Sequence, residues 1–136
     1  IMMKHSLLIY VLVLTPFAFV SADNSVLNQL TAGYRAEGAT AADAKKGQQL
    51  WNKTFAGQAP YTERSCSSCH TDKLKNKGKH VRTGKLLQPL APSVNKNSLT
   101  KIKQVEKWLK RNCKWTLSRE CSAQEKTDLL TYISQQ

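Results

Sequence analysis

The stretch Cys66-Ser67-Ser68-Cys69-His70 sets two thiols three positions apart and follows them at once with an imidazole. This spacing is the attachment pattern of c-type haem. The two thiols can form thioethers with the two porphyrin vinyl groups, and the adjacent histidine can then coordinate the iron. We therefore expect one covalent haem c, with Cys66 and Cys69 as its attachment residues and His70 as the proximal axial ligand of the iron.

Two other uses of paired cysteines fit the sequence less well. A zinc site needs two more ligands nearby, and the remaining cysteines, Cys113 and Cys121, do not form a second Cys-x-x-Cys. A thioredoxin-like redox motif is expected within a βαβ pattern, which this sequence lacks. Haem attachment is the interpretation that the motif favours.

The N-terminus has the organisation of a secretory signal peptide. A basic start at Lys4 precedes the almost continuously apolar residues 7–20, and small residues allow cleavage after Ala22. A membrane anchor is the competing interpretation, but the apolar run is shorter than the roughly 18 residues that a spanning helix needs. We expect residues 1–22 to be removed on export to the periplasm, which leaves residues 23–136 as a single domain.

The chain is strongly basic. Its 21 Lys and Arg against 9 Asp and Glu give a net charge of +12, and loss of Lys4 with the signal peptide leaves +11. Such a charge attracts acidic partners, whereas nucleic acid is an improbable partner for an exported chain without an aromatic-interleaved basic motif. The densest basic stretch directly follows the haem motif and is either a solvated loop or a contact for an acidic redox partner or the haem propionates. It comprises Lys73, Lys75, Lys77, Lys79, Arg82 and Lys85.

Apolar residues at helical spacing predict helices over residues 25–35, 40–55 and 100–112. A fourth helix is expected to begin at Ser122, because Glu125 three residues later completes a capping box before an apolar run. Almost no strand pattern is present. These elements indicate an all-α fold of about four helices around one haem, of the kind found in cytochrome c.

Three further features bear on how the helices pack. Gly47 lies inside the second predicted helix, where glycine costs about 1 kcal/mol relative to alanine, and a close helix crossing would explain it. Residues 56–65 and 71–97 lack helical periodicity. A connection as long as residues 71–97 is uncommon in a compact domain unless it wraps around a ligand, and we expect this segment to wrap the haem.

The sixth ligand of the iron separates an electron carrier from a ligand-binding protein. Electron-transfer cytochromes c use methionine or a second histidine there. Met2 and Met3 leave with the signal peptide, and His80 is the one mature histidine besides His70. His80 would make a bis-histidine electron carrier. Otherwise the position is open, or is taken by lysine or by a weak ligand such as asparagine.

The two cysteines outside the haem motif predict a disulfide, because an even remainder in an exported protein pairs in an oxidising compartment. Cys113 and Cys121 would close a short loop, and loops of this size gain only about 2 to 3 kcal/mol from the link. The bond is either a staple between the third and fourth helices or a device that fixes the position of its neighbour, Asn112.

Three stretches of the sequence, residues 90–95, 105–113 and 119–126, resemble the sphaeroides haem protein (SHP) type of class I cytochrome c. The resemblance covers nearly all of the mature chain. Its most specific part is the pair Arg-Asn-Cys and Arg-Glu-Cys at residues 111–113 and 119–121, which is far less generic than the haem motif.

The resemblance implies that an asparagine is the sixth iron ligand in the oxidised haem and leaves on reduction, so that oxygen or nitric oxide can bind. By the match of Arg-Asn-Cys this residue is Asn112, which the sequence places at the end of the third helix, and Asn95 is its nearest rival. The resemblance also implies the Cys113–Cys121 disulfide and, as partners, a dihaem cytochrome c and a membrane cytochrome b.

Gas binding at the iron would permit a terminal oxidase or nitrogen-oxide reductase activity without requiring one. The sequence spacing places no paired carboxylates or other acid and base groups near the expected haem. We therefore assign no catalytic residue from the sequence.

Overall fold

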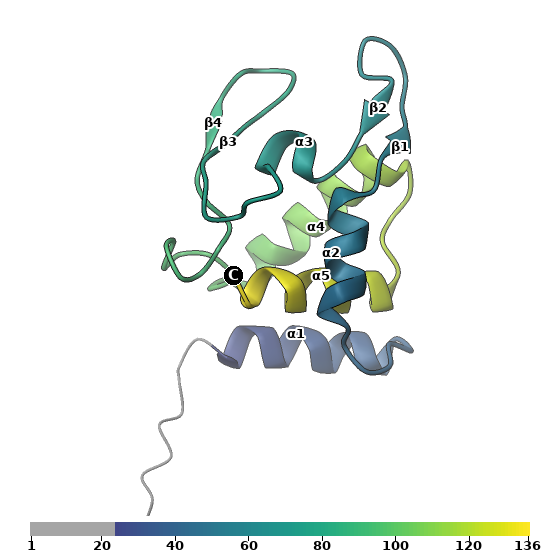
Figure 1. The fold of residues 1–136 in the computed structure, drawn as a ribbon. Coiled ribbons are helices and arrows are strands. Elements are labelled where there is room, and N and C mark those ends of the chain that lie inside the picture. Colours follow the sequence, from purple (N-terminus) through teal and green to yellow (C-terminus); the bar gives the residue numbers. More distant parts are fainter. Residues whose placement is uncertain (1–23) are drawn as a thin grey trace, which may run out of the picture.

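A computed structural model describes residues 24–136, and the expected signal peptide lies outside these residues. Within them the chain forms α1 (Asn24–Ala36), α2 (Ala44–Asn52), the single turn α3 (Ser67–His70), α4 (Ile102–Leu117) and α5 (Ala123–Ser134). α1 lies along α5, α2 crosses α5, and α3 lies above α4 (Figure 1). The all-α fold is confirmed, with the haem motif in a helix of its own. None of the helices in the described part is long and apolar enough to cross a membrane.

The expected close helix crossing at Gly47 is present between α2 and α5. Gly47 is buried, and a Cβ added there would collide with the backbone carbonyl of Asp128 and come within 2.9 Å of the Tyr132 Cβ. One turn further along α2, Trp51 packs against Tyr132 with ring centroids 6.2 Å apart. The missing side chain therefore lets the α2 backbone contact α5 directly, and this contact fixes the position of Trp51.

α2 is shorter than the helix expected over residues 40–55. It begins after Asp43, whose carboxylate accepts hydrogen bonds from the backbone amides of Lys45 and Lys46 at 2.9 and 3.1 Å. The amide of Thr40 instead donates to the Gln124 side chain on α5, at 2.7 Å. An N-cap carboxylate that satisfies the first free amides sets the helix start, and the apolar periodicity does not show it.

α4 is longer than expected, and the prediction that it ends at Asn112 is wrong. The helix continues to Leu117 because Cys113 and Thr116 extend its buried face. It ends at Ser118, whose φ of 60° is left-handed. Asn112 consequently lies in the helix interior, where it cannot move as a chain end would.

Short antiparallel hairpins form in the two regions without helical periodicity. β1 (Phe55–Ala56) pairs with β2 (Glu63–Arg64), and β3 (Gly78–Lys79) pairs with β4 (Leu86–Leu87). In Figure 1 the two hairpins stand on opposite sides of α3. Each ladder is two residues long, too short for its alternation to be seen in the sequence.

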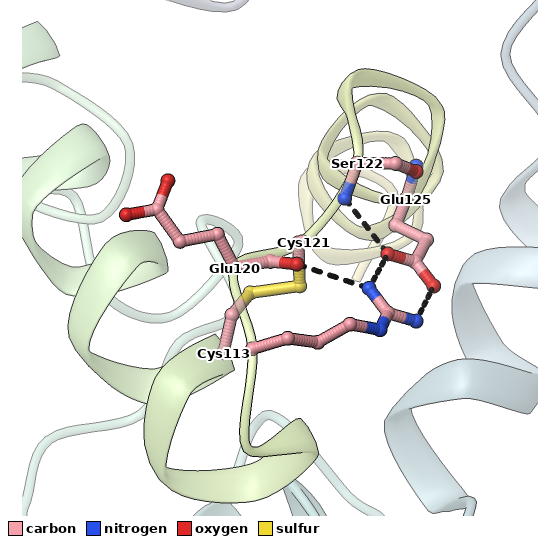
Figure 2. Close-up of a disulfide and its surroundings, with 6 residues drawn as sticks. Cys113, Glu120, Cys121, Ser122 and Glu125 are labelled. Atoms are coloured by element: carbon pink, nitrogen blue, oxygen red, sulfur yellow. Dashed lines mark hydrogen bonds and ion pairs between the residues drawn. A yellow bond between two sulfur atoms is a disulfide. The ribbon is translucent and has the colours of Figure 1, made fainter.

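A disulfide between Cys113 and Cys121 joins α4 to the start of α5, with Cα atoms 5.5 Å apart. Beside it, the capping box expected at Ser122 is confirmed: its hydroxyl accepts from the Glu125 amide at 3.1 Å, and its amide donates to the Glu125 carboxylate at 2.8 Å. The same carboxylate accepts two hydrogen bonds from the Arg119 guanidinium, at 2.7 and 2.8 Å (Figure 2). One side chain therefore holds both the helix start and the loop that the disulfide closes.

We expect Glu125→Gln to lower the free energy of unfolding at neutral pH by about 1 kcal/mol, because a capping partner and an ion pair are weakened. The hydrogen bonds from Arg119 lower the pKa of Glu125. The stabilisation by Glu125 is thus complete above the pKa that its carboxyl has in the unfolded chain. It is lost as the pH falls through the lower pKa of the same carboxyl in the folded protein. Urea unfolding at neutral and acidic pH should show the two proteins converging in acid. Glu63→Gln, at an exposed position of β2, is the matched control, and equal pH profiles for both variants would contradict the assignment.

Candidate haem site

α3 presents the haem motif as one helical turn. Cys66 stands at its N-cap, and Cys69 and His70 are its last two residues. Both thiols are free and half-buried, whereas Cys113 and Cys121 are used in the disulfide. Cys66 also packs against the buried core cluster that contains Trp51 and Cys113, as Leu109 of α4 does. The attachment turn therefore rests on the same core that α2, α4 and α5 share.

Burial determines the protonation of His70 and Cys66. Burial first, and the charge of His80 second, lower the pKa of His70 to about 4. Burial raises the pKa of the Cys66 thiol to about 11. Near pH 7 the imidazole is consequently neutral, with a lone pair available to a metal, and the Cys66 sulfur keeps its proton.

Neighbours hold α3 on two sides. The indole Nε1 of Trp51 donates to the carbonyl of Thr71 at 2.9 Å, and the Trp51 and His70 rings lie 5.6 Å apart. Thr71 has a φ of 65°, a conformation rare for a β-branched residue, directly after the expected axial ligand. From β3, a Cβ on Gly78 would collide with the carbonyl of Cys69 and lie 3.0 Å from the His70 Cα. Helix α2 and strand β3 thus fix the turn that carries the imidazole.

This donor set fits a haem. Two unpaired thiols three residues apart and a neutral imidazole are the groups that covalent attachment and axial ligation require. The segment expected to wrap the haem also presents exposed large apolar side chains, namely Val81, Leu86 and Val94. By contrast, residues 24–136 hold no group of three or more His, Cys, Asp or Glu side chains arranged to bind a metal ion directly.

Among the candidates for the sixth ligand, Asn95 and His80 have polar atoms engaged in loops. The Asn95 carboxamide donates to the Pro89 carbonyl at 2.7 Å and accepts from the Asn97 amide at 3.1 Å. The Nδ1 of His80 accepts from the amides of Arg82 and Thr83, both at 3.3 Å. Both the NH₂ group and the oxygen of the Asn95 carboxamide are therefore used in hydrogen bonds within its loop. His80 uses one of its two ring nitrogens in this way.

Asn112, by contrast, is exposed on α4 and makes no side-chain hydrogen bond to another residue of the described chain. The next residue, Cys113, is buried and disulfide-bonded. The backbone that carries Asn112 is thus anchored, while its carboxamide remains available to a ligand.

A cluster around Trp115 was not expected from the sequence. Two guanidinium groups lie over its ring, with the Cζ of Arg64 at 3.7 Å and that of Arg82 at 4.8 Å from the ring centroid. Arg64 also donates to the Trp115 carbonyl at 2.9 Å, and the Tyr61 ring meets Trp115 edge-on at 5.7 Å. The cluster ties α4 to the segment before Cys66 and to the β3–β4 connection. The charges are visible in the sequence, but no local pattern shows that these segments meet.

Comparison with known proteins shows which family has this sequence and fold. Residues 37–133 match the model of a family described as a domain of unknown function (DUF1924). Over 108 residues the chain is 43% identical to the cytochrome c-type protein SHP of Cereibacter sphaeroides, covering 79% of this chain and 82% of that protein. The chain belongs to the SHP family of c-type cytochromes. It is therefore a mono-haem cytochrome that carries haem c, as the attachment motif indicated.

Solved structures agree with the SHP assignment. The structure of oxidized SHP, described as an oxygen binding cytochrome c, aligns with a TM-score of 0.73 and 40% identity over 81% of this chain and 96% of that one. Oxidized cytochrome c'' from Methylophilus methylotrophus aligns with a TM-score of 0.70 and 32% identity over 80% and 93%. The expected family and fold are thus confirmed.

Proposed function

We propose that this SHP-family cytochrome accepts electrons and, on reduction, releases Asn112 from the iron so that oxygen, nitric oxide or a related small ligand can bind. The observation that carries the proposal is the difference between the candidate ligands. Asn112 has an uncommitted carboxamide on an anchored helix, whereas Asn95 uses both ends of its side chain in its own loop. The description of the relative SHP as oxygen binding supports the same function.

The haem supplies an iron centre that changes oxidation state and coordinates small ligands. Cys66 and Cys69 would hold it covalently, and His70, kept neutral by burial, would be the fifth ligand. A neutral carboxamide is a weak donor, and it loses further ground when the iron is reduced and becomes a weaker Lewis acid. Because Asn112 lies inside α4, release requires only rotation of its side chain, while the disulfide at Cys113 holds the backbone in place.

The second candidate function is a six-coordinate electron carrier with His80 as sixth ligand. One observation favours it: after burial, the charge of His80 is the second cause that lowers the pKa of His70. The Nδ1 of His80 is held by two backbone amides, but this leaves Nε2 for a metal. His80 is therefore the residue to test against Asn112.

The electrons would come from an acidic redox partner. With a net charge of +12 over the whole sequence, the protein attracts such a partner over long distances. By resemblance to its family, a dihaem cytochrome c and a membrane cytochrome b are the proposed donors. Export to the periplasm, with cleavage after Ala22, would bring the protein to them.

We expect reduced wild-type protein and His80→Ala to bind carbon monoxide with association rates within about twofold of each other, because His80 does not occupy the iron in this proposal. Stopped-flow absorption on the purified holoproteins measures both rates. A wild type that binds carbon monoxide only after His80 is replaced would establish the bis-histidine carrier instead. Lys85→Ala, in the same connection, controls for loss of a charge or a change in loop mobility.

A further inference from the structure

One face of α4 bears two tryptophans and the proposed ligand. Trp108, Asn112 and Trp115 follow one another at intervals of four and three residues, so they share a side of the helix. Leu109, Cys113 and Thr116 point instead into the core. At about 1.5 Å rise per residue, one indole begins roughly 6 Å before Asn112 along the helix axis and the other roughly 4.5 Å after it.

The two indoles are held very differently. Trp115 is fixed from outside its own helix, by the guanidinium groups of Arg64 and Arg82 on its ring and by the edge of Tyr61. Trp108 is 46% exposed, and its recorded cation contacts come from α4 itself: Lys107 at 6.0 Å and Arg111 at 5.2 Å. Trp115 is consequently held in place by residues outside α4, whereas the half-exposed Trp108 has room to change rotamer.

We propose that Trp108 and Trp115 wall the sixth coordination position on either side of Asn112 and set the size of ligand that can bind, with Trp108 as the movable wall. The inference rests on the proposed function, since it assumes that Asn112 marks the ligand position. Two large rigid rings separated by a carboxamide leave room for a diatomic molecule when the carboxamide turns away. A branched ligand requires Trp108 to move as well.

Ligand size provides the test. In reduced holoprotein, Trp108→Ala should raise the affinity for tert-butyl isocyanide by about tenfold or more, as expected when a bulky group is removed from a binding pocket. Carbon monoxide, which fits between the walls, should change by less than about threefold. Absorption titrations with each ligand give the ratio of affinities, and Trp108→Phe should give an intermediate ratio. Because Trp108 is half exposed and outside the core clusters, its replacement should leave the fold intact.

Lys103→Ala is the matched control, since Lys103 lies on the outward side of α4. It should leave the ratio of isocyanide to carbon monoxide affinity unchanged. If wild type binds carbon monoxide and Trp108→Ala gives the same ratio as Lys103→Ala, the wall is disproved while the proposed function stands. If reduced wild type binds neither ligand, the proposed function fails and the wall fails with it.

Discussion

The double variant Cys66→Ser/Cys69→Ser should be recovered without covalently attached haem. A serine oxygen cannot form the thioether, so both covalent bonds to the cofactor are lost together, and with them the step that keeps haem in an exported protein. The effect is expected to be complete. Haem staining after denaturing electrophoresis measures it directly, because only covalent haem stays with the chain.

Cys113→Ser/Cys121→Ser is the matched control, with the same two replacements made in the disulfide. It should keep its haem stain while losing the roughly 2 to 3 kcal/mol that a short disulfide loop contributes. Haem staining of Cys66→Ser/Cys69→Ser at the wild-type level would contradict the attachment site. His70→Ala should likewise lose stable haem capture, because it removes the one buried neutral imidazole of the motif.

Asn112→Ala should convert the oxidised protein to a five-coordinate or water-bound iron. Asn112 is exposed, and alanine is the better helix former by several tenths of a kcal/mol, so the variant should be at least as stable as wild type. Binding of cyanide to the oxidised protein should strengthen about tenfold if the asparagine occupies the iron in nine molecules of ten. The ferric absorption spectrum and a cyanide titration provide the measurements.

The rival asparagine supplies the control for this experiment. Asn95→Ala removes a carboxamide that bonds to Pro89 and Asn97, so it should destabilise the loop and leave the ferric spectrum unchanged. An unchanged spectrum in Asn112→Ala together with a changed one in Asn95→Ala would move the ligand to Asn95. If the ferric spectrum changes in neither variant, His80 or a lysine remains as the sixth ligand.

Local chemistry in the sequence predicts the helix termini where a capping group is present and misses them elsewhere. The Ser122 and Glu125 pair defines the start of α5 because both halves of the box lie within four residues. The sequence pattern places the end of α4 at Asn112, which is too early. The helix stops at a left-handed backbone conformation of Ser118, and a serine side chain does not predict that conformation. That error matters for function, since it changes the expected motion of Asn112 from a swing of the chain to a side-chain rotation.

In the haem site, too, the sequence predicts some of the residues and misses others. Cys66, Cys69 and His70 are adjacent in the chain, so their spacing alone identifies the attachment turn. The groups that position the turn come from elsewhere: Trp51 reaches Thr71 across 20 residues, and Arg64 reaches Trp115 across 51. Contacts at such separations depend on how the helices cross, and no periodicity within a segment encodes them.

Absorption spectra of the purified mature holoprotein, recorded oxidised, reduced, and reduced with nitric oxide, test the central claim most directly. The account predicts a low-spin six-coordinate iron when oxidised, a high-spin five-coordinate iron when reduced, and a clear spectral shift on addition of nitric oxide. A sharp low-spin spectrum in the reduced protein that nitric oxide leaves unchanged would contradict it, because the sixth position would then be permanently closed.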